Sequence, residues 1–297
     1  MTDVTPSKIE PTSSRIGSVI VVGIVRNIEK SFSRDFERIN KALNRFSTID
    51  WHVVESGSED ASVDFLESLA AKRQNFTFNH LELHPTLSRT ENMAIARNSY
   101  LKFLRAESRL DKYEYVIVAD FNNLNKKLTA NAIESCFSKD TWDVLTANQQ
   151  GRYYDAWALR HPLWSPNDCW EQYAFYRKYV KLPETAITYS MRSRMLRISS
   201  DSEWIEVDSA FGGLAIYKSA ILNSGAVYVG VTHSGMPVCE HVPFHSTLKS
   251  VGARIFINPG LINTRITDHS RRLTSLFTLL RIFRYPLNLI TKSKQNV

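Results

Sequence analysis

Ser18-Val-Ile-Val-Val-Gly-Ile-Val25 is a nearly continuous run of apolar residues, most of them β-branched. Such runs are typical of strands that are covered on both faces, as in parallel sheets. A second run of this type, Tyr115-Val-Ile-Val-Ala119, lies further along the chain. We therefore expect both segments to be buried strands.

Helical and extended patterns alternate between these two runs. Apolar residues from Ile28 to Phe46 recur every three or four positions, which is the period of one helix face. Strands are also predicted at 51–55 and 76–83, and helices at 59–72 and 91–104. This order predicts an α/β fold with a mostly parallel, doubly wound sheet and helices on both faces.

The second half of the chain has a less regular pattern. A helix is predicted at 129–137, and strands are predicted at 142–147 and 254–258. Between them lies an aromatic-rich stretch, 149–182, and then a polar stretch, 187–206, which predicts a mobile loop.

Composition excludes several classes of protein. The chain has 297 residues, 43% of them hydrophobic, so it can form a buried core and is not globally disordered. Its three cysteines are far apart, which argues against a disulfide framework and indicates a reducing, cytoplasmic compartment. We find no signal-peptide pattern and no stretch of about 20 apolar residues that predicts a membrane span.

The formal net charge of +7 is concentrated at one end of the chain. Residues 265–297 contain seven basic residues and one acidic residue, so the rest of the chain is nearly neutral. A nucleic-acid partner is not expected, because it would require basic residues along a whole face. Apolar residues at helical spacing from Leu273 to Phe283 predict a basic amphipathic helix that lies on an anionic membrane surface. The alternative is a helix that packs on the body of the protein.

Polar and acidic residues follow three of the predicted strands. They are Arg26-Asn27, Glu55-Ser-Gly-Ser-Glu-Asp60 and Asp120-Phe-Asn-Asn123. In open α/β sheets, ligands bind beyond the carboxyl ends of the strands. We therefore expect these side chains to gather at one edge of the sheet.

Asp120 can be interpreted in two ways. Together with Asn122 it could offer oxygen ligands to Mg²⁺ or Mn²⁺. The alternative is an Asx turn or a helix N-cap.

Two arginines on the predicted helix before Asp120 bear on this choice. Arg89 and Arg97 lie on nearly the same helix face and could bind a diphosphate. Alternatively, Arg97 forms an ion pair with Glu91 or Asp120. We expect Arg97 and Asp120 to meet at the same edge of the sheet.

In this order and spacing, the segments resemble those of the GT-A glycosyltransferases, enzymes that use nucleotide sugars and have a Rossmann-like sheet. The matching segments are Val22-Gly-Ile-Val-Arg-Asn27, Glu55-Ser-Gly-Ser-Glu-Asp60, Ala96-Arg-Asn98 and Asp120-Phe-Asn122. The resemblance covers 18–264 and implies that these segments bind the nucleotide-diphosphate sugar. The donor-binding residues it implies are Arg26, Asn27, Glu55, Ser56, Asp60, Arg89, Arg97 and Asp120.

The family's DxD metal motif reads Asp120-Phe-Asn122 in this chain. The resemblance implies a Mn²⁺ or Mg²⁺ ion bound by Asp120, Asn122 and His269. Asn122 is a neutral and weaker ligand than the usual aspartate, which leaves the requirement for metal open. His269 could equally be a solvent-facing residue of the tail.

Two downstream segments also match the family. Phe211-Gly-Gly-Leu-Ala-Ile-Tyr217 resembles its glycine loop, which implies that Gly212 and Gly213 contact the donor. Cys239-Glu-His-Val-Pro-Phe-His245 lies where an acidic catalytic motif is expected, with His241 in place of the usual aspartate.

The residues themselves suggest a general base for transfer to an alcohol. A carboxylate within hydrogen-bond reach of the acceptor hydroxyl would serve. Glu240 is the first candidate, Asp208 the second, and His241 is also a candidate catalytic residue. The alternative is a structural role for the segment, in which Pro243 sits in the first turn of a helix.

The aromatic stretch suggests an acceptor groove. Tyr154, Asp155, Trp157 and Arg160 combine the aromatic and charged groups that bind sugars. The alternative is a small satellite core, because aromatic residues are usually buried for packing. Tyr154-Asp-Ala-Trp157 and Glu240 also resemble segments of the capsule-associated mannosyltransferases and bacterial polysaccharide glycosyltransferases.

These observations define a set of expectations. Residues 1–17 form a flexible lead, 18–264 a GT-A catalytic domain and 265–297 a basic amphipathic tail. The boundary within the domain lies at 125/126, between a nucleotide-binding half and an acceptor half. We expect the protein to be a hexosyltransferase that transfers a sugar to a saccharide or lipid-linked glycan in cell-surface polysaccharide synthesis. Its expected location is cytoplasmic, peripherally bound to the inner face of the membrane. The alternatives are a sugar-nucleotidyltransferase-like enzyme and a non-catalytic carbohydrate-binding protein.

Overall fold

The structure, a computed structural model, describes residues 15–121, 123–180 and 183–265. Three predictions therefore fall outside the described residues, namely Asn122 as a metal ligand, His269 as a metal ligand, and the amphipathic tail helix. Most of the predicted N-terminal lead also falls outside them. No helix within the described residues is long and apolar enough to cross a membrane.

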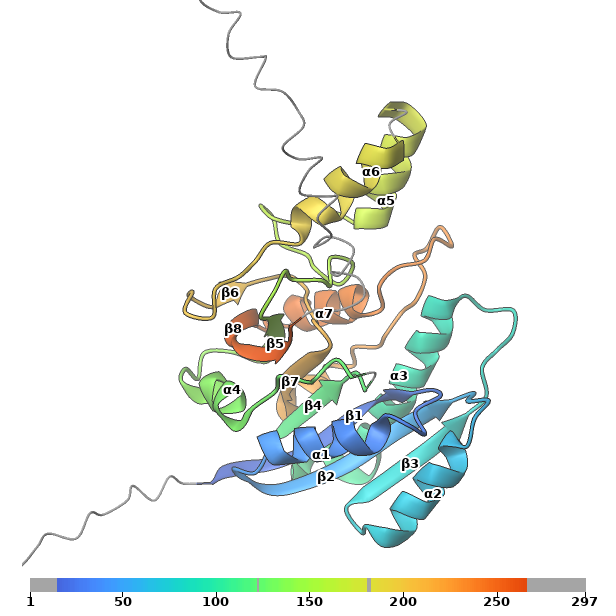
Figure 1. Ribbon diagram of the computed structural model, residues 1–297, viewed down its shortest axis with the longest axis vertical. Helices are drawn as coiled ribbons and strands as arrows, with labels where there is room; N and C mark the ends of the chain where they lie inside the picture. The colour runs from blue at the N-terminus through green and yellow to red at the C-terminus, as the bar shows by residue number, and fades with distance from the viewer. Residues whose placement is uncertain (1–14, 122, 181–182, 266–297) are drawn as a thin grey trace, which may run out of the picture.

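A single sheet forms the centre of the described chain (Figure 1), with the strand order β3-β2-β1-β4-β7-β5-β8-β6. The strands are β1 (Ile16–Val25), β2 (Phe46–Ser56), β3 (Phe76–Leu81), β4 (Tyr115–Ala119), β5 (Val144–Gln149), β6 (Ile205–Glu206), β7 (Leu214–Lys218) and β8 (Ile255–Thr264).

The first four strands form the parallel, doubly wound half that the sequence predicts. β1 pairs in parallel with both β2 and β4, and β2 pairs in parallel with β3. The second half differs, because β7 is antiparallel to both β4 and β5, and β6 is antiparallel to β8. The α/β fold is therefore confirmed, with a Rossmann-like first half and a mixed second half.

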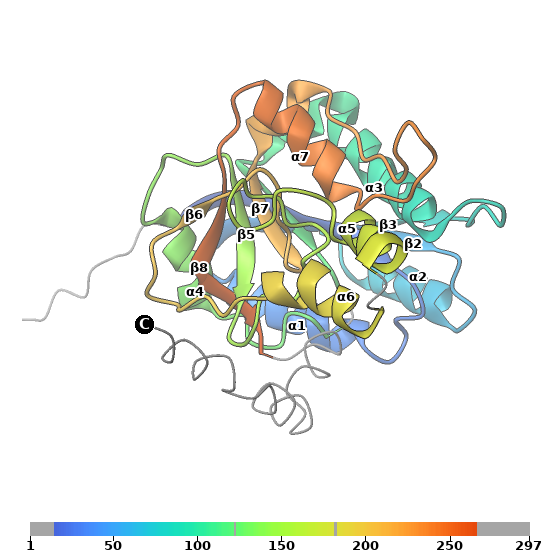
Figure 2. The same cartoon turned by 90° about the horizontal axis from the view of Figure 1, so that it is seen from above.

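Helices cover both faces of the sheet (Figure 2). Buried side chains of β1 alternate between two cores, with Val19 and Val21 in one and Ile20 and Val22 in the other. The first core contains side chains of α1 (Phe32–Ala42), α2 (Ser62–Lys72) and α4 (Ala130–Glu134). The second contains side chains of α3 (Arg89–Arg105) and α7 (His241–Ser250).

Short helical segments connect these elements. They are η1 (Ala106–Lys112), η2 (Ser135–Phe137), η4 (Arg192–Arg194) and η5 (Ser219–Ser224). A capping box begins α3, because the Ser88 side chain accepts from the Glu91 backbone N–H and Glu91 accepts from the Ser88 N–H. This cap fixes the start of the helix that carries Arg97.

Some predicted boundaries are wrong. The helix predicted at 28–46 ends at Ala42, and β2 begins at Phe46, whose ring packs against those of Tyr115 and Phe137. Strand β1 begins at Ile16, inside the predicted lead.

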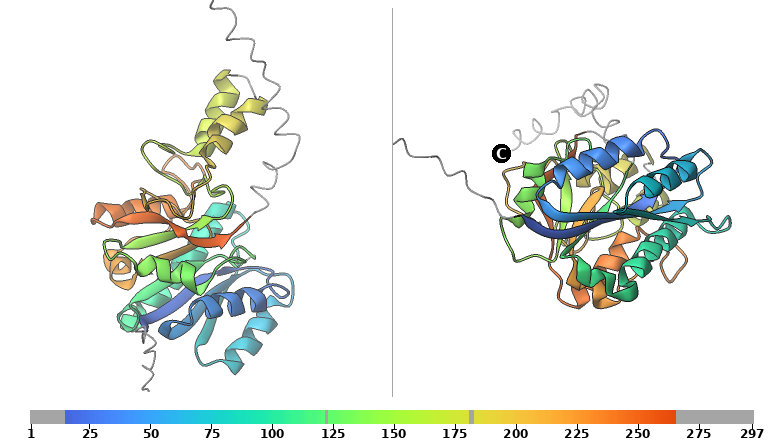
Figure 3. Two further views of the ribbon diagram at one scale, coloured as in Figure 1. Left: turned by 60° about the vertical axis from the view of Figure 1, so that its left-hand side comes forward. Right: turned by 90° about the horizontal axis from the view of Figure 1, so that it is seen from below.

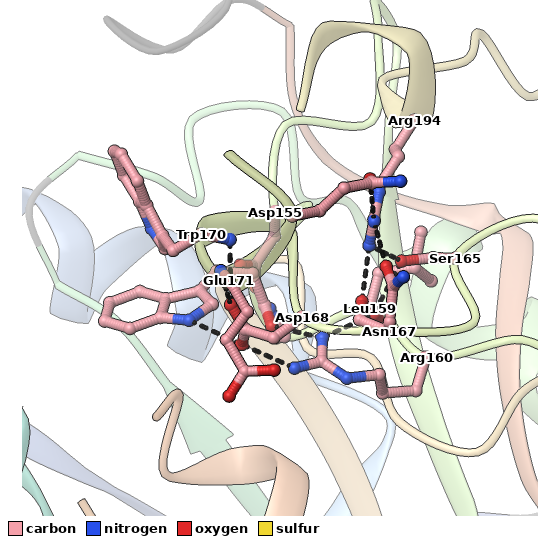
Figure 4. Close-up of polar contacts among 12 residues, drawn as sticks. Asp155, Leu159, Arg160, Ser165, Asn167, Asp168, Trp170, Glu171 and Arg194 are labelled. Atoms are coloured by element: carbon pink, nitrogen blue, oxygen red, sulfur yellow. Dashed lines mark hydrogen bonds and ion pairs between the residues drawn. The ribbon is translucent and has the colours of Figure 1, made fainter. Parts of the chain in front are cut away.

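The predicted polar loop at 187–206 is partly helical. It contains the end of α6 (Pro183–Ser190) and η4. Arg194 anchors this segment, because its guanidinium donates to Ser165 and Asn167 (Figure 4). It also donates to Gln172.

A helical hairpin projects from the body (Figures 1 and 3). It consists of α5 (Cys169–Phe175), the π-helix η3 (Tyr176–Val180) and α6. We call the described parts of this unit, residues 169–180 and 183–190, the 169–190 hairpin.

Candidate functional site

A cavity of about 980 Å³ lies beyond the carboxyl ends of β1, β2 and β4. It is lined by Arg26 after β1, Ser56 at the end of β2 and Asp120 after β4. Tyr154 and Glu240 line it from the second half of the chain. Residues from both halves therefore form one site, at the position that the sequence predicts for ligands of such a sheet.

Asp120 is placed by backbone contacts on both sides. Its N–H donates to the carbonyl of Gly213 at 3.0 Å, and its own carbonyl accepts from Asn125 Nδ2 at 2.7 Å. The side chain is 30% exposed and lines the cavity. Burial raises the pKa of this carboxyl above its ordinary value, and the attraction of Arg97 opposes that rise.

Arg97 is buried between two carboxylates, with 1% of its side chain exposed. Its Nε donates to Glu240 Oε1 at 2.8 Å, and its Nη2 donates to Asp120 Oδ1 at 3.3 Å. Tyr100 accepts from Nη1 at 3.5 Å. The meeting of Arg97 and Asp120 agrees with the sequence analysis. These partners occupy the guanidinium. The structure therefore favours the ion pair with Asp120 over direct binding of a diphosphate by Arg97.

Glu240 is the N-cap residue of α7 and is buried. Pro243 lies in the first turn of this helix, where its missing N–H costs nothing. Glu240 thus reaches the cavity from the helix N-terminus, and Arg97 fixes one of its carboxylate oxygens.

His241 is buried beside Glu240 and lines the cavity. Its ring stacks on Phe211 at 3.9 Å, and its Nε2 lies 3.8 Å from Glu240 Oε1. Neither ring nitrogen has a hydrogen-bond partner among the described residues. Burial, and then the charge of Arg97, lower the pKa of His241 well below its ordinary value, so the imidazole is neutral.

His245, one turn later, is in a different situation. Its Nδ1 contacts Ser209 Oγ at 3.0 Å and its Nε2 contacts the Tyr217 hydroxyl at 2.9 Å. Burial lowers its pKa to about 3. His245 is therefore a satisfied core residue, whereas the two buried ring nitrogens of His241 have no hydrogen-bond partner among the described residues.

The two glycines of the glycine loop position carboxylates, and it is Phe211 of this loop that lines the cavity. Gly212 and Gly213 have φ values of 69° and 85°, which favour glycine. The Gly212 N–H donates to Asp155 Oδ2 at 3.0 Å, while the Gly213 carbonyl accepts from Asp120. Donor contact by the two glycines stays a prediction, and in the structure the Gly212 N–H and the Gly213 carbonyl hold two aspartates.

Asp155 is a buried carboxyl of the cavity with a strongly raised pKa. Burial raises its pKa from 3.8 to about 6, despite the backbone N–H groups of Gly212 and Ala158, and the charges of Asp120 and Glu240 add to the rise. A carboxyl that titrates near neutrality is suited to proton transfer.

Three solved glycosyltransferase structures are similar to the chain. The mannosyltransferase PcManGT from Pyrobaculum calidifontis, in complex with GDP-Man and Mn²⁺, is 15% identical with a TM-score of 0.44, over 83% of this chain and 56% of that one. TarS 1–349 of S. aureus, in complex with UDP-GlcNAc, is 15% identical with a TM-score of 0.46, over 85% and 60%. Glucosyl-3-phosphoglycerate synthase from Mycobacterium tuberculosis, in complex with Mn²⁺, UDP and phosphoglyceric acid, is 11% identical with a TM-score of 0.37, over 84% and 67%.

The chain spans less than two thirds of the length of the first two of these proteins. No protein-family model and no curated protein matches the chain.

Several predicted donor residues lie away from the cavity. Asn27 accepts from the Glu59 N–H, and Glu55 accepts from the Ser58 N–H and contacts His80. Asp60 accepts from the backbone N–H and hydroxyl of Ser62 at the start of α2. These three side chains brace the loop after β2 instead of facing the cavity, whereas Arg26, Ser56 and Arg89 do line it.

The predicted acceptor residues also include some that line the cavity and one that does not. Tyr154, Asp155 and Trp157 line the cavity, but Arg160 does not. Arg160 Nη2 donates to Asp168 Oδ2 at 2.6 Å (Figure 4). Arg160 is therefore a structural residue.

Asp168 is a positioning residue that the sequence analysis missed. Besides binding Arg160, it accepts from the Trp170 and Glu171 N–H groups at the start of α5 (Figure 4). It also accepts from Trp157 Nε1 at 3.0 Å. An aspartate directly before a helix is a recognisable N-cap signal. It connects the cavity wall to the 169–190 hairpin.

Asp208, the second candidate for the general base, is not in the cavity. Its carboxylate pairs with Lys249 at 3.2 Å, and about half of the side chain is exposed. Lys126, which the sequence analysis missed, is an exposed cation that does line the cavity.

The raised pKa of Asp155 predicts a pH dependence of stability. The folded state binds the proton more tightly than the unfolded chain, so the free energy of unfolding should fall as pH rises from about 4 to about 6 and then level off. Asp155→Asn removes this titration. Relative to that variant, the wild type should lose about 1–3 kcal/mol across this interval, measured by urea denaturation at each pH. Parallel curves for the two proteins would contradict the shifted pKa.

Proposed function

We propose that the protein is a glycosyltransferase that moves a sugar from a nucleotide-diphosphate donor to a hydroxyl group of a saccharide or lipid-linked glycan. The observation that carries this proposal is the composition of the cavity. Three carboxyl groups (Asp120, Asp155 and Glu240) share it with three exposed cations (Arg26, Arg89 and Lys126). Its volume of about 980 Å³ suits a ligand of nucleotide-sugar size.

Two of the exposed cations, Arg89 and Lys126, suit the diphosphate of the donor, whereas Arg26 already pairs with Glu59 at 3.0 Å. Arg89 begins α3, where the positive end of the helix dipole also attracts an anion. Burial raises the pKa of Asp120, and the charge of Arg89 is one of those that oppose this rise. Stabilising charge on the departing diphosphate is the role for which fixed positive groups are most effective.

Glu240 is the preferred general base. A base must reach the acceptor hydroxyl while ionised. Arg97 is a positioning residue in this scheme, because it fixes the Glu240 carboxylate at 2.8 Å and screens it from Asp120. The neutral His241 ring lies beside Glu240, with its Nε2 3.8 Å from Glu240 Oε1, and both of its nitrogens are buried without partners among the described residues.

A divalent cation fits the cavity in part. Mg²⁺ and Mn²⁺ in nucleotide sites are held by one or two carboxylates together with phosphate oxygens. Asp120 can supply one such carboxylate, but no group of three acidic, His or Cys side chains that could hold a metal occurs among the described residues. A bound cation would neutralise charge on the diphosphate. We therefore propose Asp120 as a ligand of Mn²⁺ or Mg²⁺.

The proposed setting is the cytoplasmic face of a membrane. The basic tail, 265–297, would bind anionic lipid, and the product would be a cell-surface polysaccharide. The supporting observation is the charge of the tail.

A panel of nucleotide sugars tests the activity. We expect one donor to release nucleotide in the presence of the protein, at a rate that Mn²⁺ or Mg²⁺ raises and EDTA lowers, and to raise the melting temperature. If no nucleotide diphosphate changes the melting temperature and no donor is hydrolysed, the proposal is wrong and a non-catalytic role is favoured.

A further inference from the structure

We propose that the 169–190 hairpin is a membrane-docking element that inserts aromatic side chains into the headgroup region of an anionic lipid surface. This inference does not depend on the proposed transfer reaction. It concerns a surface distinct from the predicted C-terminal tail.

The first observation is the concentration of exposed aromatic residues on the hairpin. Among the described residues, the large apolar side chains that are exposed include four aromatic ones, Trp170, Phe175, Tyr179 and Tyr189, and all four lie on this hairpin. Phe175 is 54% exposed and Tyr179 62% exposed. Clusters of exposed apolar side chains on a protein surface mark interaction sites.

The exposed rings form a continuous surface. Phe175 contacts Tyr179 at 5.0 Å and Tyr176 at 6.0 Å between ring centres, and Tyr176 contacts Tyr189 at 6.2 Å. The hairpin projects from the body, so a flat surface can reach these rings (Figures 1 and 3). Tyrosine and tryptophan prefer the membrane interface, because their rings are apolar and their polar atoms remain hydrated.

The second observation is charge complementarity. Arg177 and Lys178 are exposed next to the aromatic residues, with Arg177 over the Tyr173 ring at 5.8 Å and Lys178 over the Tyr179 ring at 5.0 Å. Residues 169–190 contain three basic residues and two acidic ones, and the exposed pair Arg177 and Lys178 lies between Phe175 and Tyr179 in the chain. Aromatic side chains interleaved with basic ones favour anionic lipid over a neutral surface.

The third observation is the position of the hairpin relative to the cavity. Trp170 at its start, and Met191 and Met195 just after its end, line the cavity. Docking by the projecting part would bring the cavity mouth close to the lipid surface. An acceptor anchored in the same membrane could then reach the site without leaving it.

Vesicle co-sedimentation of the full-length chain tests the inference. The probe is phosphatidylcholine vesicles with and without phosphatidylglycerol. Phe175→Ser with Tyr179→Ser should reduce partitioning into phosphatidylglycerol vesicles by about tenfold or more, through loss of buried apolar area. Arg177→Glu with Lys178→Glu should also reduce this partitioning by about tenfold or more, because it removes two cations and adds two carboxylates that anionic lipid repels. Neither pair lines the cavity, so nucleotide release with a soluble acceptor should be unchanged.

Matched controls lie on the body of the protein. Ile95→Ser with Val251→Ser removes exposed apolar side chains of α3 and of the end of α7. Lys41→Glu with Lys72→Glu reverses exposed charges on α1 and α2, at the other end of the molecule from the hairpin (Figure 1). Both controls should bind vesicles as the wild type does.

Two results would overturn the inference. One is unchanged vesicle binding by the hairpin variants, which would assign any binding to another segment such as the tail. The other is a concentration-dependent dimer, measured by light scattering, that the Phe175 and Tyr179 substitutions abolish while vesicle binding persists. Equal melting temperatures of all variants verify that each is folded.

Discussion

Asp120→Asn is expected to reduce sugar transfer by about a thousandfold, which is the scale of losing one charged group at the reacting centre. Asparagine has nearly the same shape and can still accept the hydrogen bond from Arg97 Nη2, so the fold should persist. What is lost is the negative charge that lines the cavity. Nucleotide release with the best donor, together with the melting temperature, measures both consequences.

Asp208→Asn is the matched control for this experiment. Asp208 is an aspartate of the same domain that pairs with Lys249 on the surface, outside the cavity. Its substitution should leave transfer within about twofold of wild type, because an exposed ion pair contributes little. Full activity of Asp120→Asn, or a large loss in Asp208→Asn, would contradict the assignment of the site.

Arg97→Met is expected to lower the free energy of unfolding by about 3–5 kcal/mol. The substitution leaves Glu240 buried without its cation and removes the partner of Asp120. Methionine fills much of the same volume, so the cost comes mainly from uncompensated charge. Chemical denaturation with a two-state fit measures the change.

Two further variants test that explanation. Arg254→Met breaks an exposed pair with Glu206 and should cost less than about 1 kcal/mol. Arg97→Met combined with Glu240→Gln removes the buried charge as well and should recover part of the lost stability. If the double variant is less stable than Arg97→Met by the full cost of a second independent substitution, the two residues do not interact as described.

The sequence predicts the first half of the fold well because its signals are local. The runs at Ser18–Val25 and Tyr115–Ala119 are long and β-branched, and parallel pairing places their carboxyl ends at one edge. This geometry explains why Arg26 and Asp120 could be placed at the same site. Arg97 could be placed there too, because its helix precedes β4 directly.

The partners of these residues could not be predicted in the same way. Glu240 is 143 positions from Arg97, and no periodicity connects them. Glu55 looks like a ligand-binding acid in the sequence, but its carboxylate closes its own loop by accepting from the Ser58 N–H. Arg160 likewise looks like a sugar-binding residue in the sequence, but its guanidinium donates to Asp168. A polar residue's role depends on which partner folding brings near, and that information is long-range.

The second half also depends on long-range order. The antiparallel strand β7 lies between β4 and β5, although it comes after both in the chain. Its position could not be predicted from Leu214–Lys218 alone, because a short buried strand has no signal for direction.

The placement of β7 has a consequence for how a substrate enters. β7 is hydrogen-bonded to β4 along one edge and to β5 along the other, so both halves of the cavity belong to one continuous sheet. They cannot swing apart about a hinge without breaking central backbone bonds. Substrate entry and product release must therefore proceed through motions of peripheral segments, while the sheet stays rigid. The turnover rate should respond to substitutions in those segments more than to changes in sheet packing.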